Sequence, residues 1–146
     1  MWYDKYVGAP YRHLGLDLKT GIDCGNMLKL VYKEQLNIDV PYDTRTFCYD
    51  IDQNWYNNID IGNPMLELFD NPDLGFENIG NKDIQVYDIV LIHLGSSPII
   101  NHCALYVDTN KLLQVRLGHN SYISSYGNYY KQYTAGIYRY KGLKNE

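Results

Sequence analysis

The chain has few cysteines and no long apolar run, and these two shortages exclude several classes of protein. Its three cysteines, Cys24, Cys48 and Cys103, are odd in number and have no short repeated spacing, which argues against a disulfide framework. It also has no Cys-x-x-Cys pair that would suggest a zinc site. No stretch approaches the roughly 18 apolar residues that cross a bilayer, so we expect no membrane span.

Positive charge is also scarce. Thirteen Lys and Arg residues stand against seventeen Asp and Glu residues, which gives a formal net charge of −4. General affinity for nucleic acid is therefore not expected. The opening residues Met-Trp-Tyr-Asp-Lys-Tyr lack the apolar region of a signal peptide. A length of 146 residues suits one core, and we expect a single domain over residues 1–146.

The first half of the chain predicts helices. Residues 1–20 predict a loop or a short helix, because they contain two glycines, Gly8 and Gly15, and Pro10. Residues 22–36 carry apolar side chains at three- and four-residue spacing, which is typical of one helix face, and Asn37 is a suitable stop. The polar stretch that follows predicts two short helices, at about 50–58 and 63–70.

The second half predicts strands, because the apolar pattern changes to a period of two from about residue 84. The candidate strands are residues 85–93, 102–108, 111–117 and 135–141. Helices followed by antiparallel strands predict an α+β domain.

One cysteine and one histidine stand at positions that suit catalysis. Cys24 lies in the opening turn of the predicted helix, where about half a positive charge stabilises a thiolate. His102 opens the predicted strand 102–108. A cysteine on an early helix and a histidine on a later strand form the arrangement of cysteine peptidases, whose partners meet in space rather than in sequence.

These residues also have structural interpretations. A free cysteine is most often a small buried hydrophobe, and a histidine at a strand end can simply be capped by solvent. Cys103 alternates to the opposite face from His102, so we expect it in the core. Surface or structural positions are expected for His13, His93 and His119, and no role is assigned to Cys48.

Six short motifs run in order along most of the chain. They are residues 6–11 (Tyr-Val-Gly-Ala-Pro-Tyr), the Asp-Cys pair at 23–24 with apolar residues after it, 36–41 (Leu-Asn-Ile-Asp-Val-Pro), 87–90 (Tyr-Asp-Ile-Val), 102–107 (His-Cys-Ala-Leu-Tyr-Val) and 111–114 (Lys-Leu-Leu-Gln). On this ordered set the chain resembles the NlpC/P60 family of cysteine peptidases, especially the variant carried by phage tail proteins. The family has Gly-Asp-x-Val at the fourth motif and His-Val-Gly-Ile-Tyr-Leu at the fifth.

The resemblance implies a papain-like α+β fold in which the helix carrying a nucleophilic Cys24 packs on an antiparallel sheet. It implies that His102 is the catalytic base and that Gln114 is the third, orienting residue. Tyr11 and Asp23 would lie beside the nucleophile and hold either a substrate amine or the site structure. No metal and no organic cofactor are implied.

Three departures from the family pattern bear on specificity. Gly25-Asn26 follows Cys24, where the family usually has Ser-Gly and its phage forms have an aromatic residue and Gly. His13-Leu14 follows Tyr11-Arg12, where the family has two glycines after an aromatic residue. Gln114 stands where the family often has histidine. Glutamine accepts a hydrogen bond from a ring N–H and so orients an imidazole, but it carries no charge.

The spacing of His102 and Gln114 needs an irregularity in the sheet. If Thr109 and Asn110 close a tight hairpin, Gln114 pairs near Leu105. That position is roughly 10 Å along the strand from His102. A β-bulge, a strong twist or a longer loop has to close this gap if the two side chains are to meet.

Several functions remain open from the sequence. The first is hydrolysis of peptidoglycan stem peptides, at a D-γ-glutamyl bond next to a diamino acid, by a protein of a phage tail or of lysis. The second is a structural tail-assembly protein that retains the fold, and the third is an amidase or acyltransferase with the same triad. An intact Cys24/His102 pair favours an enzyme. Its partners would be the peptidoglycan peptide and other phage tail proteins, and its location the virion tail, or the host cytoplasm before release.

Overall fold

The centre of the protein is a six-stranded antiparallel sheet with strand order β3-β8-β4-β5-β6-β7. The computed structural model describes residues 1–45, 62–95 and 97–143. The strands of the sheet are β3 (Phe76–Asn78), β4 (Ile89–Ile92), β5 (His102–Asp108), β6 (Lys111–Arg116), β7 (His119–Ser125) and β8 (Thr134–Tyr140). A separate short pair, β1 (Leu16–Asp17) and β2 (Gly21–Ile22), immediately precedes the first α-helix.

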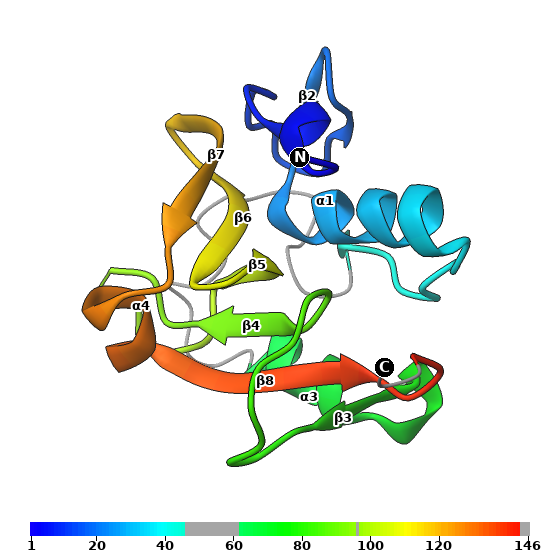
Figure 1. Cartoon of the computed structure of the whole chain (residues 1–146), viewed down its shortest axis with the longest axis vertical. Coiled ribbons are helices and arrows are strands. Elements are labelled where there is room, and N and C mark those ends of the chain that lie inside the picture. Colours follow the sequence, from blue (N-terminus) through cyan, green and yellow to red (C-terminus); the bar gives the residue numbers. More distant parts are fainter. Residues whose placement is uncertain (46–61, 96, 144–146) are drawn as a thin grey trace.

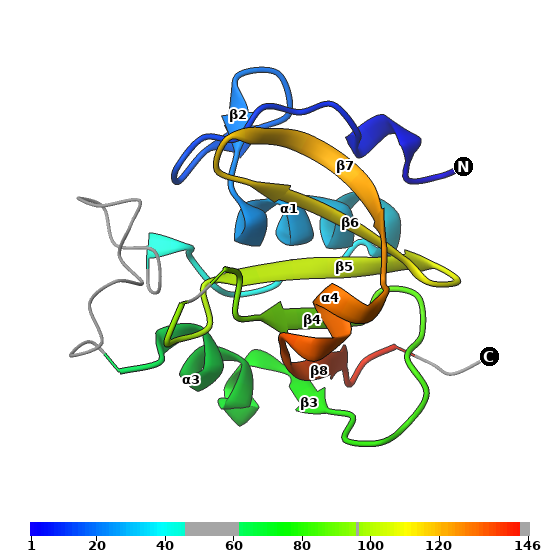
Figure 2. The same ribbon diagram turned by 90° about the vertical axis from the view of Figure 1, so that its left-hand side faces the viewer.

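Helices cover both faces of this sheet. α1 (Cys24–Val31) lies beside β5 and β6 (Figure 1), and its buried side chains share the larger core cluster with Cys103, Leu105 and Leu113. α4 (Asn128–Gln132) lies on the opposite face (Figure 2), where a smaller cluster contains Ala104 and Leu112. In the described ranges, the remaining helical segments are η1 (Asp4–Tyr6), the π-helical turn η2 (Tyr32–Leu36), α3 (Pro64–Asp70) and η5 (Pro72–Leu74).

The helix predicted over residues 22–36 is confirmed as α1 continued by η2. Asp23 caps its start, because the Asp23 carboxylate accepts a hydrogen bond from the backbone N–H of Asn26 at 2.7 Å. Asn37 ends it in the left-handed conformation, with φ of 55°. The second predicted short helix is α3, whereas the one at 50–58 lies outside the described residues.

Most predicted strands are confirmed, with shifts at their ends. The strand at 102–108 is β5, and those at 111–117 and 135–141 are β6 and β8 with small changes in their bounds. The prediction of a strand over 85–93 was too long, since β4 begins only at Ile89. A turn precedes it, in which the Asp88 N–H bonds to the Gln85 carbonyl and Tyr87 has φ of 77°.

The short elements β1, β2 and η5 were not predicted, and neither were β3, β7 and α4. Most side chains of β3, β7 and α4 are half-buried or exposed. Their sequences therefore show neither the apolar period of a helix nor that of a strand. β7 is held from both sides. It pairs with β6, and its Ser121 N–H donates to the Ala9 carbonyl at 2.7 Å while the Ser121 hydroxyl accepts from the Ala9 N–H at 2.8 Å.

A buried ion pair fixes the centre of the sheet. Asp88, just before β4, accepts from Arg139 of β8 through both carboxylate oxygens, at 2.9 and 2.8 Å. Arg139 also donates to the Asp83 carbonyl at 2.9 Å. Both side chains are almost fully buried. Removal of either one would therefore leave the charge of the other buried and uncompensated.

The prediction of an α+β domain, with a helix packed on an antiparallel sheet, is confirmed. Within the described ranges, no helix combines the length and the apolar character needed to cross a membrane.

Candidate active site

Cys24 is the first residue of α1, so its thiol lies at the positive end of the helix. Its side chain is 7% exposed and lies against the side chains of Cys103 and His102. A hydrogen bond from Cys103, and next the contact with His102, hold the pKa of the Cys24 thiol well below its ordinary value. The structure therefore favours the thiolate, which is the nucleophilic form of cysteine.

Asp23 is buried beneath the start of the helix. Besides capping the Asn26 N–H, it accepts from the Asn26 side-chain amide at 3.2 Å. The same amide donates to the Gly15 carbonyl at 3.0 Å and to the Thr44 hydroxyl at 3.2 Å. Burial, and next the charge of Cys24, raise the pKa of Asp23 to about 7. Through these hydrogen bonds, Asp23 and Asn26 hold the loop at Gly15, the start of α1 and Thr44 together.

His102, the first residue of β5, lies in contact with Gln114 of β6. The His102 Nε2 atom lies 2.9 Å from the Gln114 Oε1 atom, and both side chains are at most 2% exposed. The register between β5 and β6 shifts between Tyr106 and Asp108, so that Leu105 faces Leu113 rather than Gln114. This irregularity moves Gln114 one residue nearer to His102, so that it pairs at residue 104 and lies two residues from His102 along β5 instead of three. His102 and Gln114 are then diagonal neighbours on one face of the sheet, within reach of each other's side chains.

Tyr11 lies beside the strand that leads into the helix. It forms an isolated parallel bridge with Ile22, and the neighbouring Ile22 N–H donates to the Pro10 carbonyl at 3.0 Å. The ring is half-buried and packs against the larger core cluster. The structure thus places Tyr11 next to the residue that precedes Asp23.

The other histidines and cysteines lie elsewhere. His119 is exposed at the start of β7, and both His13 and His93 are half-buried. The prediction that Cys103 belongs to the core is confirmed, since it is fully buried. Sequence reasoning did not foresee that Cys103 also contacts Cys24. Cys48 lies outside the described residues.

Sequence reasoning also missed three supporting polar residues. Ser124 accepts a hydrogen bond from the Gln114 amide at 2.5 Å, and Asn26 and Thr44 surround the Asp23 carboxylate. Asn26 stands three residues after the cap Asp23, at the position where a helix-start signal has Glu or Gln, so its sequence position gave a partial indication of its contact with Asp23. Nothing comparable marks Ser124, because its contact depends on the register of an unpredicted strand.

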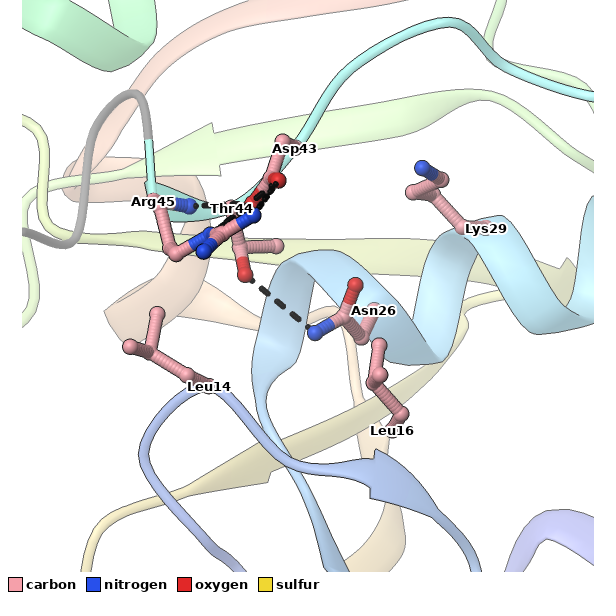
Figure 3. A pocket seen from close by; sticks show the side chains of 7 residues that line it. All are labelled: Leu14, Leu16, Asn26, Lys29, Asp43, Thr44 and Arg45. Atoms are coloured by element: carbon pink, nitrogen blue, oxygen red, sulfur yellow. Dashed lines mark hydrogen bonds and ion pairs between the residues drawn. The ribbon is translucent and has the colours of Figure 1, made fainter. Parts of the chain in front are cut away.

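A cavity of about 520 Å³ lies beside α1 (Figure 3). Its wall is formed by three segments of the chain, and one side carries the Asp43–Arg45 ion pair at 2.8 Å. The lining residues are Leu14, Leu16, Asn26, Lys29, Asp43, Thr44 and Arg45. Asn26 and Thr44 therefore connect this cavity to the buried Asp23 carboxylate.

No group of three or more His, Cys, Asp or Glu side chains in the described part of the chain is arranged to hold a metal ion. The chemistry visible at the site is that of a thiol, an imidazole and a carboxamide in contact with one another.

Solved structures of low sequence identity share this fold. A Staphylococcus aureus protein described as similar to lipoprotein, NLP/P60 family, is 19% identical with a TM-score of 0.56; the match covers 93% of this chain but 38% of that one. The NlpC/p60 domain of the peptidoglycan hydrolase SagA is 16% identical with a TM-score of 0.50, and the match covers 91% of this chain and 88% of that one. A search of the curated proteins found no match.

The sequence itself supplies the assignment. The profile of the NlpC/P60 family matches residues 8–139, which include Cys24, His102 and Gln114. The chain therefore belongs to the NlpC/P60 family.

Proposed function

We propose that this protein is a cysteine peptidase that hydrolyses amide bonds in the peptide stems of peptidoglycan. The observation that carries the proposal is the line of contacts from Cys24, at the start of α1, through His102 to Gln114. Family membership supports it, and the fold is shared with a domain of a protein described as a peptidoglycan hydrolase.

The contacts suit acylation of the thiol by the substrate. With Nε2 of His102 bound to Gln114, the other ring nitrogen is left for Cys24. The proton of the thiol passes to His102, and the thiolate attacks the amide carbonyl. His102 then protonates the leaving amine as the C–N bond breaks, which leaves a thioester on Cys24.

Water completes the cycle. His102, neutral again, takes a proton from a water molecule, which attacks the thioester; the carboxylic acid product leaves and the thiol is restored. The backbone N–H of Cys24 is free of helical hydrogen bonds, as are all N–H groups of a first helical turn. It is a suitable donor to the oxyanion that forms in each step.

The finer assignments rest on resemblance. We propose a D-γ-glutamyl bond next to a diamino acid as the bond that is cut. We also propose a role in a phage tail or in lysis, because residues 30–36 (Leu-Val-Tyr-Lys-Glu-Gln-Leu) resemble the tail variant. Tyr11 is the better candidate to hold a substrate amine, since Asp23 is only 1% exposed.

Incubation with purified muropeptides, followed by mass analysis of the products, tests the function. We expect fragments that correspond to cleavage within the stem, and no such fragments from the Cys24→Ala variant. The Cys48→Ala variant serves as a matched control and should keep activity.

The histidine needs its own control. His102→Ala should reduce turnover by orders of magnitude, whereas His119→Ala, at an exposed position, should not. Intact muropeptides after incubation with folded wild-type protein would contradict the proposed activity. Loss of turnover in His119→Ala alone would contradict the choice of base.

A further inference from the structure

The Gln114 amide is held on two sides. Its oxygen lies 2.9 Å from Nε2 of His102, and its nitrogen donates to the hydroxyl of Ser124 at 2.5 Å. The three residues come from three adjacent strands, β5, β6 and β7. Ser124 faces Leu112 in the register of β6 and β7, so it lies on the same face of the sheet as Gln114.

The orientation of this amide decides what His102 can do. A carboxamide has an accepting end and a donating end. When the oxygen faces Nε2, that nitrogen keeps its proton and the ring can become the imidazolium partner of a thiolate. If the amide were reversed, its N–H₂ group would face a ring N–H, and two donors would oppose each other.

We propose that Ser124 is a positioning residue of the active site, which fixes the Gln114 amide so that its oxygen faces His102. The amide is 1% exposed, so water has little access to replace a lost partner. Without the Ser124 hydroxyl, the amide nitrogen loses its acceptor and becomes a buried donor without a partner, which is unfavourable. The amide orientation that suits the imidazolium is then no longer favoured.

The inference rests on the proposed function only in treating Cys24 and His102 as the reacting pair. Its primary test therefore measures the thiol directly, by the rate at which iodoacetamide alkylates Cys24 as pH is varied. This reaction needs no peptidoglycan and no turnover, so it gives an answer even if the protein cleaves no muropeptide.

Two variants of equal size distinguish the effect of losing the hydroxyl from the effect of changing the packing at residue 124. Ser124→Thr keeps the oxygen, whereas Ser124→Val replaces it with a methyl group of similar shape, and both β-branched side chains suit a strand. Ser125→Val provides the matched control, because Ser125 is exposed and points to the other face of β7.

We expect Ser124→Val to move the rise in alkylation rate to higher pH by about one unit, which corresponds to the loss of about one hydrogen bond. At any pH below this rise, alkylation would slow about tenfold. Ser124→Thr and Ser125→Val should keep the wild-type profile. Where muropeptides are cleaved, kcat should fall in Ser124→Val with little change in KM.

A wild-type alkylation profile in Ser124→Val would overturn the inference. An equal shift of the alkylation profile in Ser124→Thr and Ser124→Val would overturn it as well. The shift would then come from the changed packing at residue 124 and not from the loss of the hydroxyl. If Ser124→Val does not fold, Ser124→Ala takes its place. We then expect the alkylation profile of Ser124→Ala to shift to higher pH by the same amount. A profile identical to that of the wild type would refute the role of Ser124.

Discussion

Asp23 should make the protein less stable as pH rises. The pKa of its carboxyl is raised from 3.8 to about 7 in the folded state, chiefly by burial. The folded state therefore binds a proton that the unfolded state has released, over the range from about pH 4 to about pH 7. Stability falls with pH wherever the folded state binds more protons. The contribution is full below about pH 4 and is lost once pH passes about 7.

The size of the effect follows from the two pKa values. A difference of about three in pKa corresponds to about 4 kcal/mol. Asp23→Asn removes the ionisable group but keeps a side-chain oxygen that can cap the Asn26 N–H. We expect the free energy of unfolding of the wild type, relative to this variant, to fall by about 4 kcal/mol between pH 4 and pH 8.

Urea unfolding of both proteins at several pH values measures this difference. Asp73→Asn is the control, because Asp73 is exposed in η5 and its replacement should give a difference that does not vary with pH in this way. A constant difference between wild type and Asp23→Asn across the range would refute the reasoning. A difference of the opposite sign would show that the folded protein favours the charged carboxylate.

Three further outcomes are expected. Arg139→Met should lower the free energy of unfolding by about 3–5 kcal/mol, because Asp88 stays buried without its partner; a loss below 1 kcal/mol in urea unfolding would contradict this. Cys103→Ala should raise the pKa of Cys24, since Cys103 supplies the strongest stabilisation of the thiolate, and an unchanged pH profile of alkylation would argue against that contact. Gln114→His should retain muropeptide turnover while Gln114→Ala slows it, because only histidine can still hydrogen-bond the catalytic ring; equal rates would remove the orienting role.

Local signals in the sequence were sufficient to predict part of the site. Asp23 and Cys24 could be placed at a helix start because capping and apolar spacing are properties of neighbouring residues. Asn37 could be chosen as the stop for the same reason, since asparagine tolerates the left-handed conformation found there. His102 could be assigned to a strand from the alternating pattern that follows it.

The remaining features depend on how distant segments meet. Whether Gln114 reaches His102 is decided by the irregularity between β5 and β6, which no local pattern specified. Ser124 lies on a strand whose mixed polar sequence gave no clear period. The conformation of Tyr87 also could not be predicted from neighbouring residues. The family has glycine at this position, whereas here a tyrosine adopts φ of 77°. Its ring packs against the distant Trp2 ring, with 5.2 Å between the ring centroids.

The most direct test of the account is the relative reactivity of the three cysteines in the folded protein. Brief treatment with limiting iodoacetamide near neutral pH, followed by peptide mass analysis, measures the labelling rate of each thiol. The account predicts that Cys24 reacts faster than Cys48 and Cys103, because the helix start, Cys103 and His102 stabilise its thiolate. Equal labelling of all three would contradict the assignment of Cys24 as the nucleophile.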